Sequence, residues 1–212
     1  MKKQDCLGTD LYGLTGEVYS QGRSNIAVVT AMLKAGIQII QYREKEKKQR
    51  YKYEECRQIR ALTQEYNATF IVNDDIEIAK LVKADGVHIG QEDLPIELVR
   101  QIVGPDMIIG LSTHSPQQAQ DAVKRGADYI GVGPIFATKT KKDVCSPVGF
   151  DYLDYVVKEI DLPFVAIGGI KADNINQVTA HGAKCIALVT EIVGADDIAA
   201  KVIEIRRNMK QA

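Results

Sequence analysis

The amino-acid sequence predicts a single-domain α/β protein that folds as a (β/α)8 barrel of the TIM type. Short β-rich runs alternate with amphipathic helical patterns along the whole chain of 212 residues, and the alternation occurs eight times without a linker or low-complexity segment. Eight successive strand–helix units predict a closed barrel, with one domain spanning residues 1–212. An open doubly wound sheet is the alternative, but it would need a GxGxxG-type turn that the first unit, LYGLTGEVYS, lacks.

The predicted strands are four to seven residues long, rich in Ile and Val and almost continuously apolar. This composition is expected of parallel strands, which are covered by helices on one face and packed inside the barrel on the other. They lie at residues 11–15, 36–42, 69–73, 86–90, 107–112, 129–133, 164–169 and 185–190.

Amphipathic helices are predicted between the strands, and several carry clear end signals. Ser115 and Pro116 form an N-cap and a first helical residue, while the segments KAG (34–36), KRGAD (124–128) and HGAK (181–184) each end a helix at a glycine. The helices lie at residues 25–35, 51–66, 75–83, 95–103, 116–125, 150–159, 173–181 and 196–208.

Composition and charge argue against several classes of function. Hydrophobic content of 45% and charged content of 26% are ordinary, and a net charge of −1 gives no reason to expect nucleic acid or an anionic membrane as a partner. The N-terminus lacks a signal-type apolar region, and no run approaches the roughly 18 apolar residues of a membrane span. The four cysteines are scattered without a CxxC pair. We therefore expect a cytoplasmic protein with reduced cysteines.

The second predicted strand ends in QYREK, which places Gln41, Arg43 and Lys45 on one side of the chain. Barrel active sites gather at the carboxyl ends of the strands, so these side chains are candidates for the barrel mouth. The alternative is a solvated charge run, because EKEKKQR continues directly behind them. Taken alone, this segment favours the charge run.

Carboxylates follow the third and fourth strands. Asn73, Asp74 and Asp75 precede a helix, and Asp93 lies just ahead of Pro95. One helix cap would explain one residue of each group, but not two carboxylates beside an asparagine. Asp74 and Asp93 on neighbouring units would suit Mg²⁺, which is held by one or two carboxylates together with water and phosphate oxygens.

The later strand ends offer anion-binding groups. Ser112 ends the fifth strand, with His114 close behind, although both could be ordinary loop residues. The long segment 133–150 could be a lid or merely a flexible lysine-rich loop. Its hydroxyl and ammonium donors are Thr138, Lys139, Thr140, Lys141 and Lys142.

Gly168-Gly169 and Val189-Thr190 follow the last two strands, where barrels often bind a phosphate through backbone N–H groups. A plain tight turn is the alternative. Together, the strand ends predict two anion subsites, one cationic and metal-assisted for a diphosphate and one neutral for a monophosphate. No strand end carries a lysine deep in the barrel for Schiff-base chemistry, so the site fits departure of a Mg²⁺-bound diphosphate.

These residues together resemble the thiamine phosphate synthase family, whose members are (β/α)8 transferases of vitamin B1 synthesis. The matching segments follow one another along nearly the whole chain: QYREK, NDD, DGVHIGQEDLP, GLSTHS, DYIGVGPIFATKTKKD, PVGF and AIGGI. The resemblance implies condensation of 4-amino-2-methyl-5-pyrimidinylmethyl diphosphate with 4-methyl-5-(2-phosphooxyethyl)thiazole, giving thiamine phosphate and diphosphate. Diphosphate would leave first, and the thiazole nitrogen would trap the resulting pyrimidine carbocation.

The resemblance also implies residue roles. Asp74 and Asp93 would bind Mg²⁺, and the catalytic set would be Arg43, Lys45, Ser112 and Lys141. The pyrimidine diphosphate would contact Gln41, Tyr42, Arg43, Glu44, Lys45, Asn73, Ser112 and Lys141. The thiazole phosphate would contact Thr138, Lys139, Thr140, Gly169, Val189 and Thr190.

Three positions depart from the family pattern. Thr190 replaces a common serine, Cys145 replaces a small residue, and Glu191 adds a negative charge that would weaken phosphate binding if it faced inward. A thiazole tautomerase of the same fold is disfavoured, because the QxRxK, Asn-Asp and TxTK sets are all present. A non-catalytic thiamine phosphate-binding protein is a further alternative. The sequence leaves the oligomeric state open, a homo-oligomer included.

Overall fold

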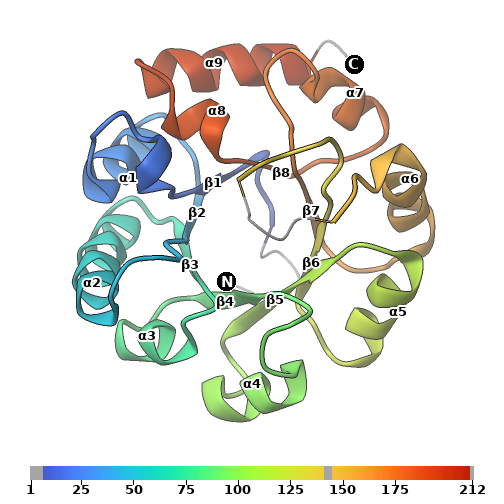
Figure 1. Cartoon of the computed structure of the whole chain (residues 1–212), viewed down its shortest axis with the longest axis horizontal. Helices are drawn as coiled ribbons and strands as arrows, with labels where there is room; N and C mark the ends of the chain where they lie inside the picture. The colour runs from blue at the N-terminus through green and yellow to red at the C-terminus, as the bar shows by residue number, and fades with distance from the viewer. Residues whose placement is uncertain (1–6, 141–144, 211–212) are drawn as a thin grey trace.

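The computed structural model describes residues 7–140 and 145–210, and its strands form a closed parallel barrel in the order β1 to β8. Helices surround the barrel on the outside (Figure 1). The predicted fold class is therefore confirmed. The strands are β1 (Leu11–Leu14), β2 (Ile39–Tyr42), β3 (Thr69–Asn73), β4 (Gly86–Ile89), β5 (Ile108–Thr113), β6 (Tyr129–Val132), β7 (Phe164–Ile167) and β8 (Ile186–Leu188).

The helices follow the predicted positions to within a few residues at each end. Two short elements were not predicted, the 3-10 helix η2 (Glu17–Tyr19) and helix α8 (Thr190–Val193). Both lie directly after strands, at the rim of the barrel. The remaining helices are α1 (Asn25–Lys34), α2 (Gln49–Glu65), α3 (Ile76–Leu81), α4 (Ile96–Val103), α5 (Pro116–Lys124), α6 (Gly149–Glu159), α7 (Ile175–Ala180) and α9 (Ile198–Met209).

The predicted helix ends are confirmed where the sequence signals were strongest. The hydroxyl of Ser115 accepts a hydrogen bond from the backbone N–H of Gln118, with Pro116 as the first helical residue. Gly36 ends α1 with a φ of 79°, a conformation that glycine adopts at little cost, and Ile37 then donates back to the carbonyl of Met32. This tight exit turns the chain directly into β2.

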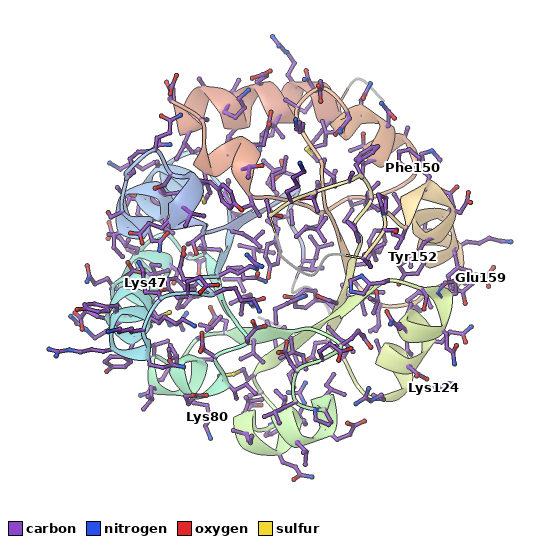
Figure 2. The ribbon with its side chains drawn as sticks, in the orientation of Figure 1. Lys47, Lys80, Lys124, Phe150, Tyr152 and Glu159 are labelled. Carbon is purple, nitrogen blue, oxygen red and sulfur yellow. The ribbon has the colours of Figure 1, made fainter. Side chains whose placement is uncertain are left out.

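The strands separate two packed layers of apolar side chains, one inside the barrel and one between the strands and the helices. The inner layer is small and contains two tyrosines, Tyr12 and Tyr129, whose hydroxyls are 2.8 Å apart. Gly110 makes room for this pair, because a Cβ there would lie 2.1 Å from the ring of Tyr129. Side chains fill the space between the ribbons (Figure 2). The other inner residues are Leu14, Ile39, Ile71, Ile108, Val165, Cys185 and Ala187.

Arg206 on α9 joins the last helix to the segment ahead of β1 and to the end of α1. Its guanidinium lies 2.7 Å from the carboxylate of Asp10, just ahead of β1, and donates to the carbonyls of Ala35 and Gly36 at 2.8 Å each. Burial by itself would raise the pKa of Asp10, but the hydrogen bond and charge of Arg206 hold that pKa below its usual value. The last helix is thereby fixed to the first strand–helix unit.

Replacing Arg206 with methionine should lower the free energy of unfolding by about 1–3 kcal/mol, because several acceptors lose a charged donor. The stabilisation from Asp10 is present above its unfolded-state pKa of about 4 and is lost as pH falls through the lower folded-state pKa. Denaturant unfolding of both proteins at neutral pH and near pH 3 should therefore show a smaller difference in acid. Arg57→Met is the control: it removes an exposed ion pair with Glu54, which water and salt screen, and should change the unfolding free energy far less. Equal losses for the two variants would contradict this role of Arg206.

Candidate active site at the barrel mouth

A cavity opens at the carboxyl ends of the strands and collects residues from every part of the chain that carried predicted site residues. A second hollow adjoins it at the ends of β7 and β8. Predicted residues that line the main cavity are Gln41, Arg43, Lys45, Asn73, Asp74, Asp93, Ser112, Thr138, Thr140 and Val189. Those that line the second hollow are Thr138, Lys139, Thr140, Gly169, Val189 and Thr190. Lys141, and Lys142 beside it, lie outside the described residues.

The end of β2 directs Gln41 and Arg43 toward the mouth. Gln41 is almost fully buried and donates to the hydroxyl of Tyr12 at 2.9 Å. The backbone N–H of Arg43 donates to the hydroxyl of the buried Thr15 at 2.8 Å. Over residues 7–140 and 145–210, no hydrogen bond or ion pair engages the Arg43 guanidinium. The backbone of Arg43 is thus fixed, and Arg43 lines the cavity, where a ligand could bind its guanidinium. This arrangement differs from the solvated charge run that the sequence taken alone favoured.

Tyr42 lies between these two residues and points to the opposite face of the strand. It is buried, and its hydroxyl donates to the carboxylate of Glu55 on α2 at 2.7 Å. Glu44 turns aside in the same way and accepts from the backbone N–H of Glu17 at 3.0 Å. The expected contact of the Tyr42 side chain with a substrate is therefore corrected: neighbouring strand residues face opposite sides, so Tyr42 holds α2 instead.

Asp74 and Asp93 meet in the main cavity, and neither acts as a helix cap. Asp74 has a φ of 61°, a conformation that is uncommon outside glycine and is concentrated at functional positions, and its carboxylate pairs with Lys45. The carboxylate of Asp93 accepts from the N–H of Gly90 at 2.6 Å. Asp75 is bound elsewhere, by Lys52 of α2 at 2.8 Å. Asp74, Asp75 and Asp93 therefore have separate partners.

The electrostatics of the acid pair suit a cation. Burial raises the pKa of Asp74, Lys45 opposes this shift, and the charge and contact of Asp93 raise the pKa further. Two carboxylates that repel each other in a partly buried place are stabilised by a positive ion. No group of three or more His, Cys, Asp or Glu side chains in the described part of the chain is arranged to hold a metal. One or two carboxylates are the set that Mg²⁺ ordinarily uses with water and phosphate, so the residues fit it.

A chain of hydrogen bonds below the cavity contains residues to which the sequence analysis gave no role. His88 lies between the hydroxyls of Tyr129 and Ser112, 2.9 Å from each. Ser112, expected to be a free hydroxyl at the mouth, lines the cavity but is bound to His88. The one available signal was His88 itself, a polar residue inside the otherwise apolar strand GVHIG.

Gly168 and Gly169 provide space for the chain that leaves β6. Ile135 and Phe136 donate to the carbonyls of Ile167 and Gly168 at 3.0 and 2.9 Å. Added Cβ atoms would lie 2.4 Å from Pro134 at Gly168 and 2.6 Å from the Ala137 carbonyl at Gly169, and both glycines have positive φ. The pair is therefore more than a tight turn, because it lets the backbone of the loop approach the end of β7.

Glu191 turns away from the second hollow. Its carboxylate accepts from the backbone N–H of Ala172 at 3.2 Å and lies 3.7 Å from the ammonium group of Lys201 on α9. The charge that would have opposed an inward-facing phosphate is therefore bound on the outer side. Cys145 is exposed, and the structure gives no reason for its identity.

Comparison with known proteins identifies the family. The family model described as thiamine monophosphate synthase matches residues 11–192. The chain belongs to this family. A thiamine-phosphate synthase of Pelotomaculum thermopropionicum is 66% identical over 94% of this chain and 92% of its own length. One from Lawsonia intracellularis is 58% identical over 95% and 93%. The solved thiamine phosphate pyrophosphorylase from Pyrococcus furiosus superposes with a TM-score of 0.88, at 35% identity over 97% of this chain and 98% of its own.

Membership of the thiamine monophosphate synthase family confirms the predicted resemblance and the prediction of an enzyme of the transferase type. The family match runs from the first residue of β1 into α8, so it includes every strand end that lines the cavity. Among the described residues, no helix is both long and apolar enough to cross a membrane.

Replacing Gly169 with alanine should destabilise the fold more than replacing Gly126 with alanine. Both residues have positive φ, but an added Cβ meets nothing within 4 Å at Gly126. Gly126→Ala should therefore cost about 1 kcal/mol from backbone conformation alone. Gly169→Ala adds overlap with the loop from β6 and should cost a further 1–3 kcal/mol, roughly the cost of overpacking. Denaturant unfolding measures both values, and equal losses would contradict the close-approach role.

Proposed function

We propose that the protein condenses 4-amino-2-methyl-5-pyrimidinylmethyl diphosphate with 4-methyl-5-(2-phosphooxyethyl)thiazole to give thiamine phosphate and diphosphate. One observation supports this proposal above the others: a single barrel mouth combines the Asp74–Asp93 pair and Arg43, whose guanidinium has no partner among the described residues, with an adjoining hollow lined by Gly169. Two phosphorylated substrates that must meet require two such subsites side by side.

The cationic subsite would receive the pyrimidine diphosphate. Arg43 offers a guanidinium that has no partner among the described side chains and can bind phosphate oxygens in bidentate fashion. Lys45 lies on the Asp74 carboxylate and would exchange it for a phosphate oxygen. Asp74 and Asp93 would hold Mg²⁺, which when bound supplies positive charge to the leaving diphosphate. Gln41 would contribute its buried amide at the base of the cavity.

The second hollow would receive the thiazole phosphate. Its hydroxyls come from Thr138 and Thr140, whose Oγ1 atoms are 3.0 Å apart. Its backbone comes from Gly169 and Val189-Thr190, and a phosphate can accept hydrogen bonds from N–H groups there without a charged side chain. Lys139 and Lys171 also line this hollow, so it is not the uncharged subsite that the sequence predicted, and both lysines add positive charge for a phosphate.

The reaction that suits this geometry is dissociative. The C–O bond to the diphosphate breaks, the electron pair leaves with the diphosphate, and the aminopyrimidine stabilises the carbocation. The lone pair of the thiazole nitrogen then forms the new C–N bond. This nitrogen carries no proton, so no base is needed, and the chain's own residues act by orienting the substrates and by stabilising the charge on the leaving group. Arg43 and Lys45 would do most of the latter.

Wild-type protein mixed with both substrates and Mg²⁺ should form thiamine phosphate and diphosphate in equal amounts, measured by liquid chromatography with mass spectrometry. Chelation of the metal should stop product formation, and added Mg²⁺ should restore it. Binding without product would favour the non-catalytic alternative. Turnover that is unaffected by complete metal removal would contradict the role of Asp74 and Asp93. A cytoplasmic location and binding of these two small molecules are part of the same proposal.

Replacing Arg43 with alanine, or Asp74 with asparagine, should lower kcat/KM by about 10²-fold or more, because each removes charge from the leaving-group site. Residues at strand ends carry little of the core, so unfolding free energies should change little. Lys124→Ala is the matched control for charge: Lys124 lies on α5 at the outer edge of the molecule (Figure 2) and should leave kcat/KM unchanged. Near-normal activity of Arg43→Ala would exclude its assigned role.

A further inference from the structure

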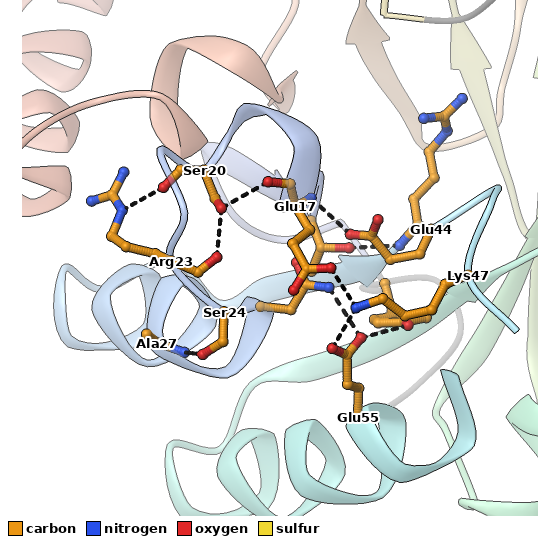
Figure 3. Close-up of polar contacts among 12 residues, drawn as sticks. Glu17, Ser20, Arg23, Ser24, Ala27, Glu44, Lys47 and Glu55 are labelled. Carbon is orange, nitrogen blue, oxygen red and sulfur yellow. Dashed lines mark hydrogen bonds and ion pairs between the residues drawn. The ribbon is translucent and has the colours of Figure 1, made fainter. Parts of the chain in front are cut away.

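Two basic side chains in the charged segment after β2, Arg43 and Lys47, differ in their partners. The Arg43 guanidinium has no partner among the residues of known placement. The ammonium group of Lys47, four residues later, is bound twice: it lies 2.6 Å from Oε2 of Glu17 and 2.6 Å from Oε1 of Glu55 (Figure 3). Only 18% of the Lys47 side chain is exposed. Lys47 is therefore part of the structure and not of a solvated charge run.

Glu55 is the fixed end of this arrangement. Its other oxygen accepts from the hydroxyl of Tyr42 at 2.7 Å and from the amide of Asn25 at 3.1 Å. The side chain is only 17% exposed, and a carboxylate that is mostly buried stays where its donors are. Glu55 thus ties the outer face of β2 and the start of α1 to α2, with Lys47 as its charged partner.

Glu17, the other partner of Lys47, is less firmly held than Glu55. Its backbone N–H is held by Glu44 at 3.0 Å, while its carboxylate has Lys47 as its ion-pair partner and is 39% exposed. Glu17 also lines an open hollow together with Arg43 and Lys45. Glu44, Glu46 and Lys139 line the same hollow, and the Glu44 carboxylate is already engaged by the N–H of Glu17. Without Lys47, the partly exposed Glu17 carboxylate would lose its ion-pair partner on a hollow that it shares with Arg43 and Lys45, and opposite charges attract.

We propose that Lys47 is a positioning residue: it binds the carboxylates of Glu17 and Glu55, so that Glu17 cannot pair with Arg43 or Lys45. The Arg43 guanidinium then stays available for a diphosphate group, and Lys45 has only the Asp74 carboxylate to exchange for one. This inference rests on the proposed function, which assigns a diphosphate to them. Burial by itself would lower the pKa of Lys47, but hydrogen bonds to Glu17 and Glu55 hold it above its usual value, so the ammonium group is charged at neutral pH.

The test compares Lys47→Met, Glu17→Gln and the double variant. Binding of inorganic diphosphate with Mg²⁺ is measured by calorimetry, and steady-state kinetics give KM for each substrate. Lys47→Met should weaken diphosphate binding about tenfold and raise KM for the pyrimidine diphosphate by a similar factor, while KM for the thiazole phosphate stays unchanged. Glu17→Gln alone should behave like wild type.

The double variant carries the decisive result. Because the Glu17→Gln replacement removes the competing carboxylate, it should restore diphosphate binding of Lys47→Met to within about twofold of wild type. If Lys47 contacted the diphosphate directly, the Glu17→Gln replacement would not restore the binding that is lost in Lys47→Met. Lys48→Met is the matched control: it removes the same charge one residue later, at the exposed N-cap of α2, and should leave both measurements unchanged.

Denaturant unfolding of all variants separates this effect from loss of the fold. Diphosphate binding by the double variant that is as weak as that of Lys47→Met would overturn the inference, and so would an equal rise in both KM values. If the wild type turns over and Lys47→Met binds diphosphate normally, this inference fails and the proposed function stands. If the wild type makes no thiamine phosphate, the proposed function fails, and the binding of inorganic diphosphate still decides the role of Lys47.

Discussion

Closure of eight parallel strands into one barrel is the constraint on which the site depends. Parallel strands all end on the same rim, so residues that are far apart in the chain meet there, such as Arg43, Asp93 and Val189. Alternation along each strand then decides which side chains face inward. In β2 this selects Gln41 for the interior and directs Tyr42 to α2.

The burial of a charged side chain near the rim of the barrel decides whether it is paired within the protein. Lysines with little exposed surface, such as Lys47 and Lys52, are paired with carboxylates, because an unpaired ion in a partly desolvated place is costly. Arg43 lines the cavity and has no such partner in the part of the chain that the structure describes. The same division applies to the acids: Asp75 and Glu55 are saturated by donors, whereas Asp74 lies close to a second carboxylate and has a raised pKa. A ligand would stabilise a charged group such as Arg43, and a cation would stabilise one such as Asp74.

Close approach between backbone segments shapes the barrel mouth near β6 and β7. Gly168 and Gly169 admit the chain leaving β6, and Gly110 admits the ring of Tyr129 beneath the cavity. In each place the absence of a Cβ decides how near two segments come. Gly168 and Gly169 line the second hollow, and Tyr129 is hydrogen-bonded to His88. Small residues thus define the shape of a site whose chemistry is carried by larger ones.

The sequence by itself determined the order and type of the main elements, because hydrophobic periodicity, caps such as Ser115 and helix-ending glycines such as Gly36 act locally. It also indicated the rim residues, since strand ends can be identified from the same pattern. The short elements η2 and α8 escaped prediction, because four residues or fewer carry no periodicity. Only the tertiary structure decided the partners. Lys47 and Arg43 are alike in the sequence, but Lys47 is neutralised by acids from η2 and α2, whereas no acid of residues 7–140 and 145–210 pairs with Arg43. Pairing depends on contacts between distant segments, and no local pattern contains that information.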